Sequence, residues 1–270
     1  MTSCATGSLD GLIIDLDGVV WVGSQPIPGS AEAISELRSR GVRTLFLTND
    51  PQASSQYYAK RLTAMGVPTP ASDIVTAGTA LATLVVEREG PGTNVFVIGS
   101  PSLKRTMATA GLMLRAGKEG SHAQAVVVGG HEGFDYAELR TATQALRRGG
   151  RLYAAGRDST FPMPDGPWPG TGSVVAAVEV AGGARAICAG KPEPYIFDIA
   201  RALLHGCRRI GIVGDNLESD IAGGRRAGLA TVLVLTGATT PQQARSAQLA
   251  ADITVRDLAD LTAILGETSS

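Results

Sequence analysis

The chain has 270 residues, 44% of them hydrophobic and 18% charged, which allows one large domain or two ordinary ones with a sizeable core. Its formal net charge of −1 gives no electrostatic reason to expect a nucleic-acid polymer or an anionic membrane as a partner. No apolar run reaches the length of a membrane span, the N-terminus lacks the apolar centre of a signal peptide, and the three cysteines form no CxxC pair. We therefore expect a reduced, cytoplasmic protein.

The two ends of the chain share one pattern, in which short apolar, β-branched runs alternate with segments of helical periodicity. The strand candidates are LIIDLDG (12–18), VRTLFLTND (42–50), DIVTAG (73–78), RAICAG (185–190), RIGIVGD (209–215) and ATVLVLTG (230–237). The helix candidates are SAEAISELRSRG (30–41), SSQYYAKRLTAMG (54–66), a stretch that Pro192 opens and Gly206 closes, and NLESDIAGGRRAG (216–228). Strands that alternate with helices predict an α/β fold with a parallel sheet covered on both faces.

The middle of the chain has a rhythm of its own. Its strand candidates are NVFVIG (94–99), AVVVGG (125–130) and RLYAAG (151–156), and its helical stretches lie at about 101–110 and 135–149. We interpret 77–185 as a second domain inserted into a discontinuous core of residues 8–76 and 186–264, with flexible tails at 1–7 and 265–270. The alternative is a single continuous sheet of about ten strands.

The strand candidates of the core end in polar residues that can carry chemistry. The first run delivers Asp15 and Asp17, whose side chains share one face because positions i and i+2 of a strand point the same way. Later runs end in similar residues: TLFLTN in Thr48 and Asn49, RAICAGK in Lys191, and RIGIVGD in Asp215. Asp220 follows Asp215 by five residues. Ligands of open α/β sheets bind at the carboxyl ends of the strands, so convergence of these run ends would build a site.

Such a site would hold four carboxylates, one ammonium group and one hydroxyl group. The excess of negative charge favours a hard divalent cation with oxygen ligands, and Mg²⁺ is the natural choice. One carboxylate could attack phosphorus and form an aspartyl phosphate, while a second gives a proton to the leaving oxygen and later takes one from water. Lys191, the Thr48 hydroxyl and backbone N–H groups would hold the phosphoryl oxygens.

Each of these residues also has a structural interpretation. A single DxDG at a strand end is more often a turn closed by aspartate hydrogen bonds, and its glycine stands at the wrong position for an EF-hand loop. Lys191 could be a solvated residue at a helix start, and Asp215 could be a helix cap. Their occurrence together, in this order and each at a strand end, favours the functional interpretation.

Four segments resemble, in order, the four motifs of the haloacid dehalogenase (HAD) superfamily: DLDGVV (15–20), LTND (47–50), GKPEP (190–194) and GDNLESDIAGGRRAG (214–228). The resemblance spans most of the chain and implies a Rossmann-like, doubly wound parallel-sheet core with an inserted α/β cap domain. It implies Asp15 as nucleophile, Asp17 as general acid/base, Lys191 as the catalytic lysine, and Thr48 with Asn49 at the phosphate. Asp15 and Asp215 would bind Mg²⁺ by side chain and Asp17 by its carbonyl oxygen, with Asp220 supporting the metal ligands.

Two details favour one branch of this superfamily. Asp17 is typical of its phosphatases, because the dehalogenases lack the second aspartate. The interval between Asp15 and Thr48 is too short for a cap, whereas that between Thr48 and Lys191 is long enough. This pattern resembles the NagD, 4-nitrophenyl phosphatase, phosphoglycolate, glycerol-3-phosphate and pyridoxal phosphate phosphatases.

The resemblance therefore implies a Mg²⁺-dependent hydrolase of small phosphomonoesters. Candidate substrates are glycerol 3-phosphate, phosphoglycolate, pyridoxal phosphate, 4-nitrophenyl phosphate and nucleotide or sugar phosphates. Relatives often dimerise through the cap, so a homodimer is the candidate assembly. A phosphotransferase and a catalytically weak binding or regulatory protein of the same fold remain the alternatives.

Three residues of the inserted segment are candidates for contact with the substrate. His131 lies near a loop, where a lone histidine is more often structural, and Arg157 could pair with an anionic group of the substrate. Asp158 aligns with an acidic position of the family and could face the substrate or cap a loop. The stretches 130–132 and 156–158 depart from the family's usual sequences, so the substrate does not follow by analogy.

Two residues beside the motifs also bear on the pocket. Asp50 stands where the family has asparagine or serine, and this extra carboxylate could face solvent or weaken phosphate affinity. Trp21, just after the first motif, is a candidate wall of the pocket.

Overall fold

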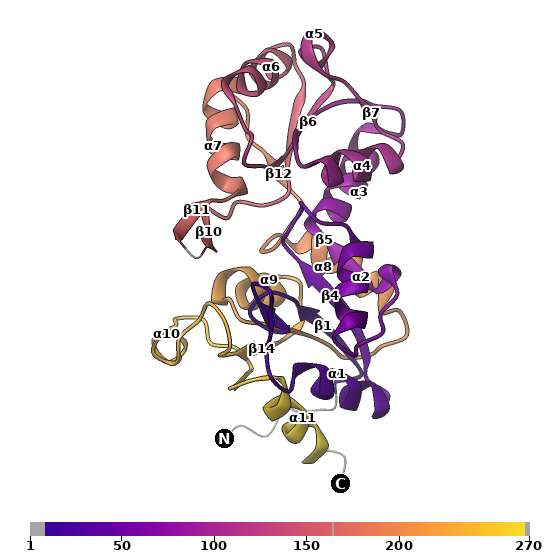
Figure 1. The fold of residues 1–270 in the computed structure, drawn as a ribbon, viewed down its shortest axis with the longest axis vertical. Helices are drawn as coiled ribbons and strands as arrows, with labels where there is room; N and C mark the ends of the chain where they lie inside the picture. Colours follow the sequence, from indigo (N-terminus) through magenta and orange to yellow (C-terminus); the bar gives the residue numbers. More distant parts are fainter. Residues whose placement is uncertain (1–8, 164, 268–270) are drawn as a thin grey trace. The chain divides into compact units, whose positions relative to one another are not determined.

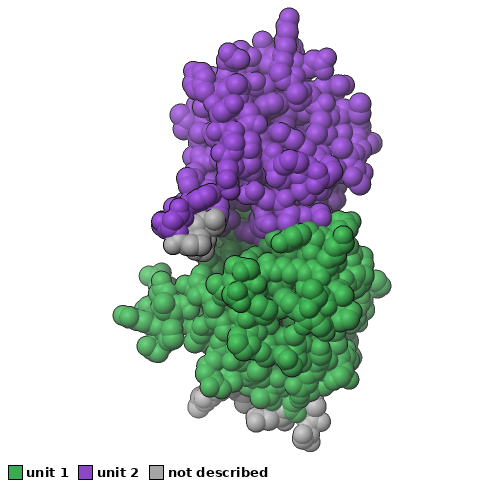
Figure 2. All heavy atoms as spheres, viewed as in Figure 1, with its two compact units in different colours: residues 1–48, 55–75, 191–270 green, residues 49–54, 76–190 purple. Residues whose placement is uncertain are grey.

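Figure 1 shows the computed structural model, which describes residues 9–163 and 165–267. The chain divides into two units, one of residues 1–48, 55–75 and 191–270 and the other of residues 49–54 and 76–190 (Figure 2). No helix of the described residues is long and apolar enough to cross a membrane.

The two predicted flexible tails have different outcomes. Residues 1–7 and 268–270 lie outside the described residues. For residues 265–267 the prediction is wrong, because helix α11 (Leu258–Glu267) continues through them and the Leu265 side chain is buried. An apolar residue in a last helical turn is held by packing even where the sequence around it turns polar.

The first unit is built around a six-stranded sheet with the strand order β15-β14-β13-β1-β4-β5. Its strands are β1 (Gly11–Asp15), β4 (Arg43–Thr48), β5 (Ile74–Thr76), β13 (Ile210–Gly214), β14 (Ala230–Val234) and β15 (Ile253–Val255). The first strand of the sheet, β1, lies in the centre; β4 and β5 follow on one side of it, and β13, β14 and β15 follow on the other. The pairs β1–β4, β1–β13, β13–β14 and β14–β15 are parallel, which confirms the predicted doubly wound parallel sheet.

The central strands of this sheet are buried on both faces. Every residue of β1 is buried, as are all residues of β4 after Arg43. Such strands read as continuous apolar runs because helices cover both sides of the sheet. The helical elements are α1 (Ser30–Ser39), α2 (Ser55–Ala64), η1 (Ala71–Asp73), α8 (Pro194–Leu203), the π-helical η2 (Leu217–Ala222), α9 (Gly223–Arg226), α10 (Pro241–Ser246) and α11. A short hairpin of β2 (Trp21–Val22) and β3 (Gln25–Pro26) follows β1.

The helix expected to open at Pro192 begins two residues later. The Lys191–Pro192 peptide bond is cis, and Glu193 has an extended backbone as the N-cap. Pro194 takes the first helical position, where a missing N–H is tolerated because the first-turn N–H groups have no helical partner.

The second unit has its own five-stranded sheet with the strand order β12-β9-β8-β6-β7, in which each strand is parallel to its neighbours. The strands are β6 (Asn94–Gly99), β7 (Met113–Leu114), β8 (Ala125–Gly130), β9 (Arg151–Ala154) and β12 (Ile187–Cys188), and β10 (Thr160–Met163) and β11 (Gly166–Pro169) form a hairpin. The helices are α3 (Ala77–Glu89), α4 (Pro101–Thr109), α5 (Gly117–Gly120), α6 (Tyr136–Arg147) and α7 (Thr171–Gly182). Residues of β6, β8, β9, α6 and α7 share one apolar core.

Strand β12 corrects the interpretation of RAICAG as a core strand. It pairs with β9, with Ile187 opposite Tyr153 and Cys188 opposite Ala154, and so belongs to the sheet of the second unit. We predicted that the second part of the core begins at residue 186, but Ile187 and Cys188 belong to the sheet of the second unit. The alternative of one sheet of about ten strands is wrong for the described residues, whose two large sheets have six and five strands.

Candidate active site

Strand pairing in the first unit brings the sequence-predicted aspartates together. Ile14 lies opposite Val213 in the β1–β13 pair, so Asp15 at the end of β1 and Asp215 just after β13 are neighbours at the carboxyl edge. Thr48 ends β4 on the other side of β1 and is 2% exposed. This edge is also where the winding direction of the sheet reverses, which is where ligands of doubly wound folds bind.

A buried lysine links two of the carboxylates. Lys191 Nζ lies 2.8 Å from Asp15 Oδ1 and 2.6 Å from Asp220 Oδ1. Lys191 is 2% exposed and Asp220 is fully buried. The second oxygen of Asp220 accepts hydrogen bonds from the Asn216 backbone N–H at 3.1 Å and from Ser219 Oγ at 3.3 Å. Asp220 therefore holds the lysine and the turn at the start of η2 in place.

The third carboxylate, Asp215, is held by segments that the sequence interpretation missed. Its Oδ2 accepts a hydrogen bond from the backbone N–H of Ala238, in the loop after β14. Thr236 in the same loop donates to the Gly18 carbonyl oxygen. The sequence did carry a signal for this loop, because the run ATVLVLTG ends in the polar Thr236, and a polar strand end is the pattern that identified the other site residues.

Gly18 of the first motif is required by this geometry. Its φ is +80°, in the left-handed region, and a Cβ at this position would lie 2.2 Å from Asp215 Oδ2. The glycine therefore lets the loop after β1 turn against the carboxylate of the neighbouring strand.

Burial and like charges shift the pKa values of this cluster. Burial raises the pKa of Asp15 well above its usual value, Lys191 opposes that shift, and Asp220 and Asp215 add to it. Burial and the nearby Asp220 raise the pKa of Asp215 to about 6. Burial alone would lower the pKa of Lys191, but Asp15 and Asp220 outweigh it and raise the pKa, so the ammonium group stays charged.

The same cluster fits a divalent cation. Asp15, Asp215 and Asp220 are buried, and one carboxylate oxygen of each lies within 4.8 Å of the others. Three carboxylates against one ammonium group leave an excess of negative charge that a divalent cation would balance. All three residues offer the oxygen ligands that hard cations prefer, and Asp220 already accepts from Lys191, which suits a supporting role.

Asp17, the second aspartate of the first motif, differs from the buried cluster because its side chain is exposed. Its Oδ1 accepts a hydrogen bond of 2.8 Å from the indole N–H of Trp21. An exposed carboxyl group can exchange protons with solvent, which a general acid/base must do.

Four other predicted site residues belong to the second unit. Asn49 directly follows Thr48, and its side-chain amide donates to Asp158 Oδ2 at 3.3 Å. His131 follows β8, and its Nε2 lies 2.8 Å from Glu138 Oε2 on α6. Their contact with a substrate stays a prediction.

Arg157, the fourth of these residues, is part of an ion-pair network. Its guanidinium group binds both carboxylate oxygens of Glu179 on α7, at 2.7 and 3.3 Å, and donates to the Ala186 carbonyl oxygen at 3.2 Å. Glu179 also accepts from the Ala186 N–H at 2.8 Å and from Arg185 at 3.3 Å. The Arg157 hydrogen bond and those of Ala186 and Arg185 outweigh burial and hold the pKa of Glu179 at about 2.

This network predicts a pH-dependent stability for the second unit. Since the folded pKa of Glu179 lies below the usual 4.5, its contribution is full above pH 4.5 and is lost as the pH falls towards 2. Glu179→Gln should lower the free energy of unfolding by about 1–3 kcal/mol at pH 7, with a smaller difference from wild type at pH 3. Urea unfolding at both pH values measures this. The exposed Glu87→Gln, on α3, is the matched control, and equal stability of Glu179→Gln and wild type at pH 7 would contradict the prediction.

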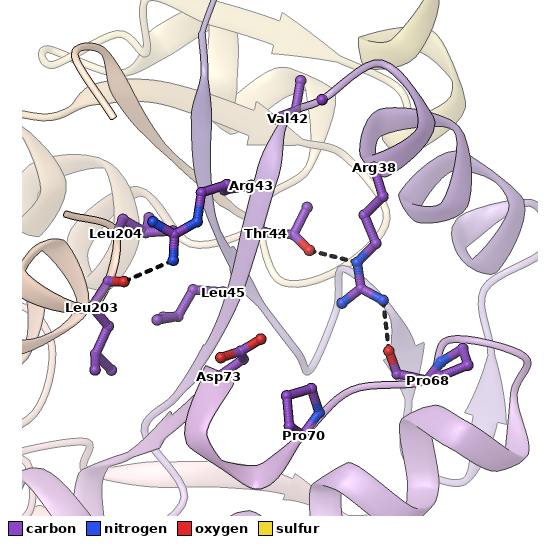
Figure 3. Close-up of a pocket in the computed structure, with 11 residues that line it drawn as sticks. Arg38, Val42, Arg43, Thr44, Leu45, Pro68, Pro70, Asp73, Leu203 and Leu204 are labelled. Carbon is purple, nitrogen blue, oxygen red and sulfur yellow. Dashed lines mark hydrogen bonds between the residues drawn. The ribbon is translucent and has the colours of Figure 1, made fainter. Parts of the chain in front are cut away.

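A cavity of about 360 Å³ lies elsewhere in the first unit, at the amino end of β4 (Figure 3). Arg38 lines it and donates to Thr44 Oγ1 and to the Pro68 carbonyl oxygen, each at 2.8 Å. Arg43 donates to the Leu203 carbonyl oxygen at 3.1 Å. Both guanidinium groups thus tie loops and helix ends to the strand, and the cavity lies at the opposite end of β4 from Thr48.

Comparisons with known proteins agree with the geometry. The family model "Haloacid dehalogenase-like hydrolase" matches residues 12–113, and a second, HAD-hydrolase-like model matches residues 188–261. Acid sugar phosphatase of Staphylococcus saprophyticus is 32% identical over 247 residues, covering 91% of this chain and 94% of the relative. Chronophin of Rattus norvegicus is 37% identical over 251 residues, covering 89% and 81%. The structure of glycerol phosphate phosphatase from Mycobacterium tuberculosis in complex with magnesium has a TM-score of 0.86 at 34% identity, covering 95% and 77%.

The chain therefore belongs to the haloacid dehalogenase-like hydrolases. Within that family it is a phosphatase, as the first motif predicted. The predicted family, α/β fold and enzyme class are thus confirmed.

Proposed function

We propose that this protein hydrolyses small phosphomonoesters through an aspartyl phosphate on Asp15, with Mg²⁺ as cofactor. The observation that carries the proposal is the buried cluster at the carboxyl edge of the first sheet. There, Lys191 contacts Asp15 and Asp220, and Asp215 lies alongside. A nucleophile, a fixed cation and a set of carboxylate ligands are together what phosphoryl transfer requires.

The first chemical step uses the two aspartates of the first motif. A carboxylate oxygen of Asp15 attacks phosphorus, and the bond from phosphorus to the ester oxygen breaks. The carboxyl group of Asp17 gives its proton to that leaving oxygen, which departs as an alcohol, and Asp17 becomes a carboxylate. Lys191 and the Thr48 hydroxyl hold the phosphoryl oxygens during transfer.

The second step returns the enzyme to its starting state. Asp17 takes a proton from a water molecule as the water oxygen attacks phosphorus. The bond from phosphorus to Asp15 breaks and inorganic phosphate is released. Asp15 is then a carboxylate again, and Asp17 is again a protonated carboxyl group. Asp15, Asp215 and the Asp17 carbonyl oxygen would hold Mg²⁺, which would neutralise charge on the transferring group.

We expect the choice among substrates to depend on residues that lie outside the catalytic cluster. His131, Arg157 and Asp158 are our candidates for substrate contact from the second unit. Relatives include an acid sugar phosphatase and a glycerol phosphate phosphatase, which supports the proposal that the substrate is a small phosphorylated metabolite. We include phosphoglycolate, pyridoxal phosphate, 4-nitrophenyl phosphate and nucleotide phosphates in the same class.

A panel of these phosphomonoesters, assayed for phosphate release in Mg²⁺ buffer, tests the proposal. We expect hydrolysis of 4-nitrophenyl phosphate and of at least one metabolite. Addition of ethylene glycol separates the alternatives, because a phosphotransferase would form the phosphorylated glycol in place of inorganic phosphate. A protein that hydrolyses no member of the panel would fit the binding or regulatory alternative and would overturn the proposal.

Metal removal gives a separate prediction. Excess EDTA should abolish hydrolysis, and added Mg²⁺ should restore it, because the buried carboxylates need the cation to accept a phosphate dianion. The control is the same addition and removal of EDTA with Mg²⁺ present throughout in excess. Full activity in EDTA would disprove the requirement for a metal.

A further inference from the structure

The indole of Trp21 contacts the second aspartate of the first motif. Trp21 opens β2, is fully buried, and donates its N–H to Asp17 Oδ1 at 2.8 Å. Backbone bonds close the same loop, since the Gly18 N–H donates to the Trp21 carbonyl oxygen at 2.6 Å. The indole and the carboxylate it contacts are therefore parts of one compact turn after β1.

Helix α2 fixes the orientation of this indole. The indole ring of Trp21 stacks on the ring of Tyr58, with a centroid distance of 6.0 Å and an interplanar angle of 7°. The guanidinium carbon of Arg61 lies 3.8 Å from the ring centroid on the indole, and Arg61 also donates to the Gly23 carbonyl oxygen. These two residues hold the plane of the indole ring, and its N–H donates to Asp17 Oδ1.

We propose that Trp21 is a positioning residue, which orients the Asp17 carboxyl group for proton transfer to the leaving oxygen. This rests on the proposed function of Asp17. An aspartate side chain rotates about two bonds, and a bond to one oxygen from a fixed donor sets the plane of the carboxyl group. Because Oδ1 accepts the indole hydrogen, we assign the transferred proton to Oδ2. Proton transfer depends steeply on such geometry.

The leaving group provides the test. An alkyl phosphate needs a proton on its leaving oxygen, whereas 4-nitrophenolate leaves without one. Trp21→Phe keeps an aromatic ring and removes the N–H. We expect kcat/KM to fall about 10-fold or more for the alkyl phosphate that wild type hydrolyses best, and less than about 3-fold for 4-nitrophenyl phosphate, because general acid catalysis is worth about 10²–10⁴-fold.

Two further variants separate positioning from packing. Replacing Trp21 by 3-benzothienylalanine exchanges the N–H for sulfur at nearly unchanged shape, so it should show the same selective loss with an unchanged thermal midpoint. It also serves if Trp21→Phe does not fold. Trp168→Phe removes another indole–aspartate bond, to Asp165 at 2.8 Å in the β10–β11 hairpin, and should not discriminate between leaving groups.

The outcomes distinguish this inference from the proposed function. Equal losses for alkyl and aryl substrates, in an otherwise active enzyme, would overturn the inference alone and leave Trp21 as a packing residue. Full activity of the benzothienylalanine variant on both substrates would do the same. Failure of wild type to hydrolyse either substrate would overturn the proposed function, and the inference with it.

Discussion

Asp15→Asn should lower kcat/KM at least about 10⁴-fold on every substrate that wild type hydrolyses, because an amide oxygen cannot replace the attacking carboxylate. Its stability should behave differently. Burial and the nearby Asp220 and Asp215 raise the pKa of Asp15, so its ionised form is disfavoured in the folded protein even beside Lys191. A neutral asparagine removes that unfavourable charge, and we expect a metal-free variant at least as stable as wild type.

Steady-state kinetics and urea unfolding in EDTA measure the two effects of Asp15→Asn. Asp198→Asn makes the same chemical change at an exposed position on α8 that pairs with Arg201, and it should keep activity. Unchanged phosphatase activity in Asp15→Asn would show that another residue is the nucleophile. Assays on freshly prepared protein guard against slow deamidation back to aspartate.

Lys191→Met should have the opposite effect on stability. It leaves Asp15 and Asp220 buried together without the ammonium group that contacts both. Removing one partner of a buried ion pair is expected to lower the free energy of unfolding by about 3–5 kcal/mol. Activity should also fall by about 10²-fold or more, because the phosphoryl oxygens lose a fixed cation.

Mg²⁺ gives a second signature of the Lys191→Met variant. A cation that binds the remaining carboxylates stabilises the folded state, so Mg²⁺ should restore part of the lost stability. Urea unfolding in EDTA and in Mg²⁺ measures this, with exposed Lys60→Met on α2 as the matched control, expected within about 0.5 kcal/mol of wild type. A Lys191→Met protein as stable as wild type in EDTA would contradict our account of the charge balance in the cluster.

The position of the candidate active site at one edge of the first sheet was predictable because its signals are local. An apolar, β-branched run that ends in a carboxylate or hydroxyl group can be recognised within a few residues. Asp15, Thr48 and Asp215 follow that pattern, and β1, β4 and β13 do end at or directly before them. Parallel pairing of those strands then brings the three residues to one edge.

Lys191 shows where the local pattern fails. The run RAICAG before it looks like the others, but its strand β12 pairs with β9 in the second unit. The partner of a parallel strand is chosen by contacts far apart in sequence, and a run of two paired residues carries no signal of which sheet it joins. The position of Lys191 close to Asp15 and Asp220 was foreseen, whereas the sheet that the preceding strand joins was not.

The sequence by itself predicted the central strands β1, β4, β13 and β14, the polar residues at the ends of the strands, and the family, because periodicity, strand ends and motifs depend on neighbouring residues. Only the tertiary structure decided which groups donate hydrogen bonds to these carboxylates: Trp21 to Asp17, Ala238 to Asp215, and Arg157 to Glu179. Trp21 was expected as a pocket wall, and it is instead a fully buried donor held by α2. The Ala238 and Arg157 contacts join segments far apart in sequence, and the Trp21 contact with Asp17, although local, depends on how Tyr58 and Arg61 of α2 hold the indole, so no local pattern specifies any of them.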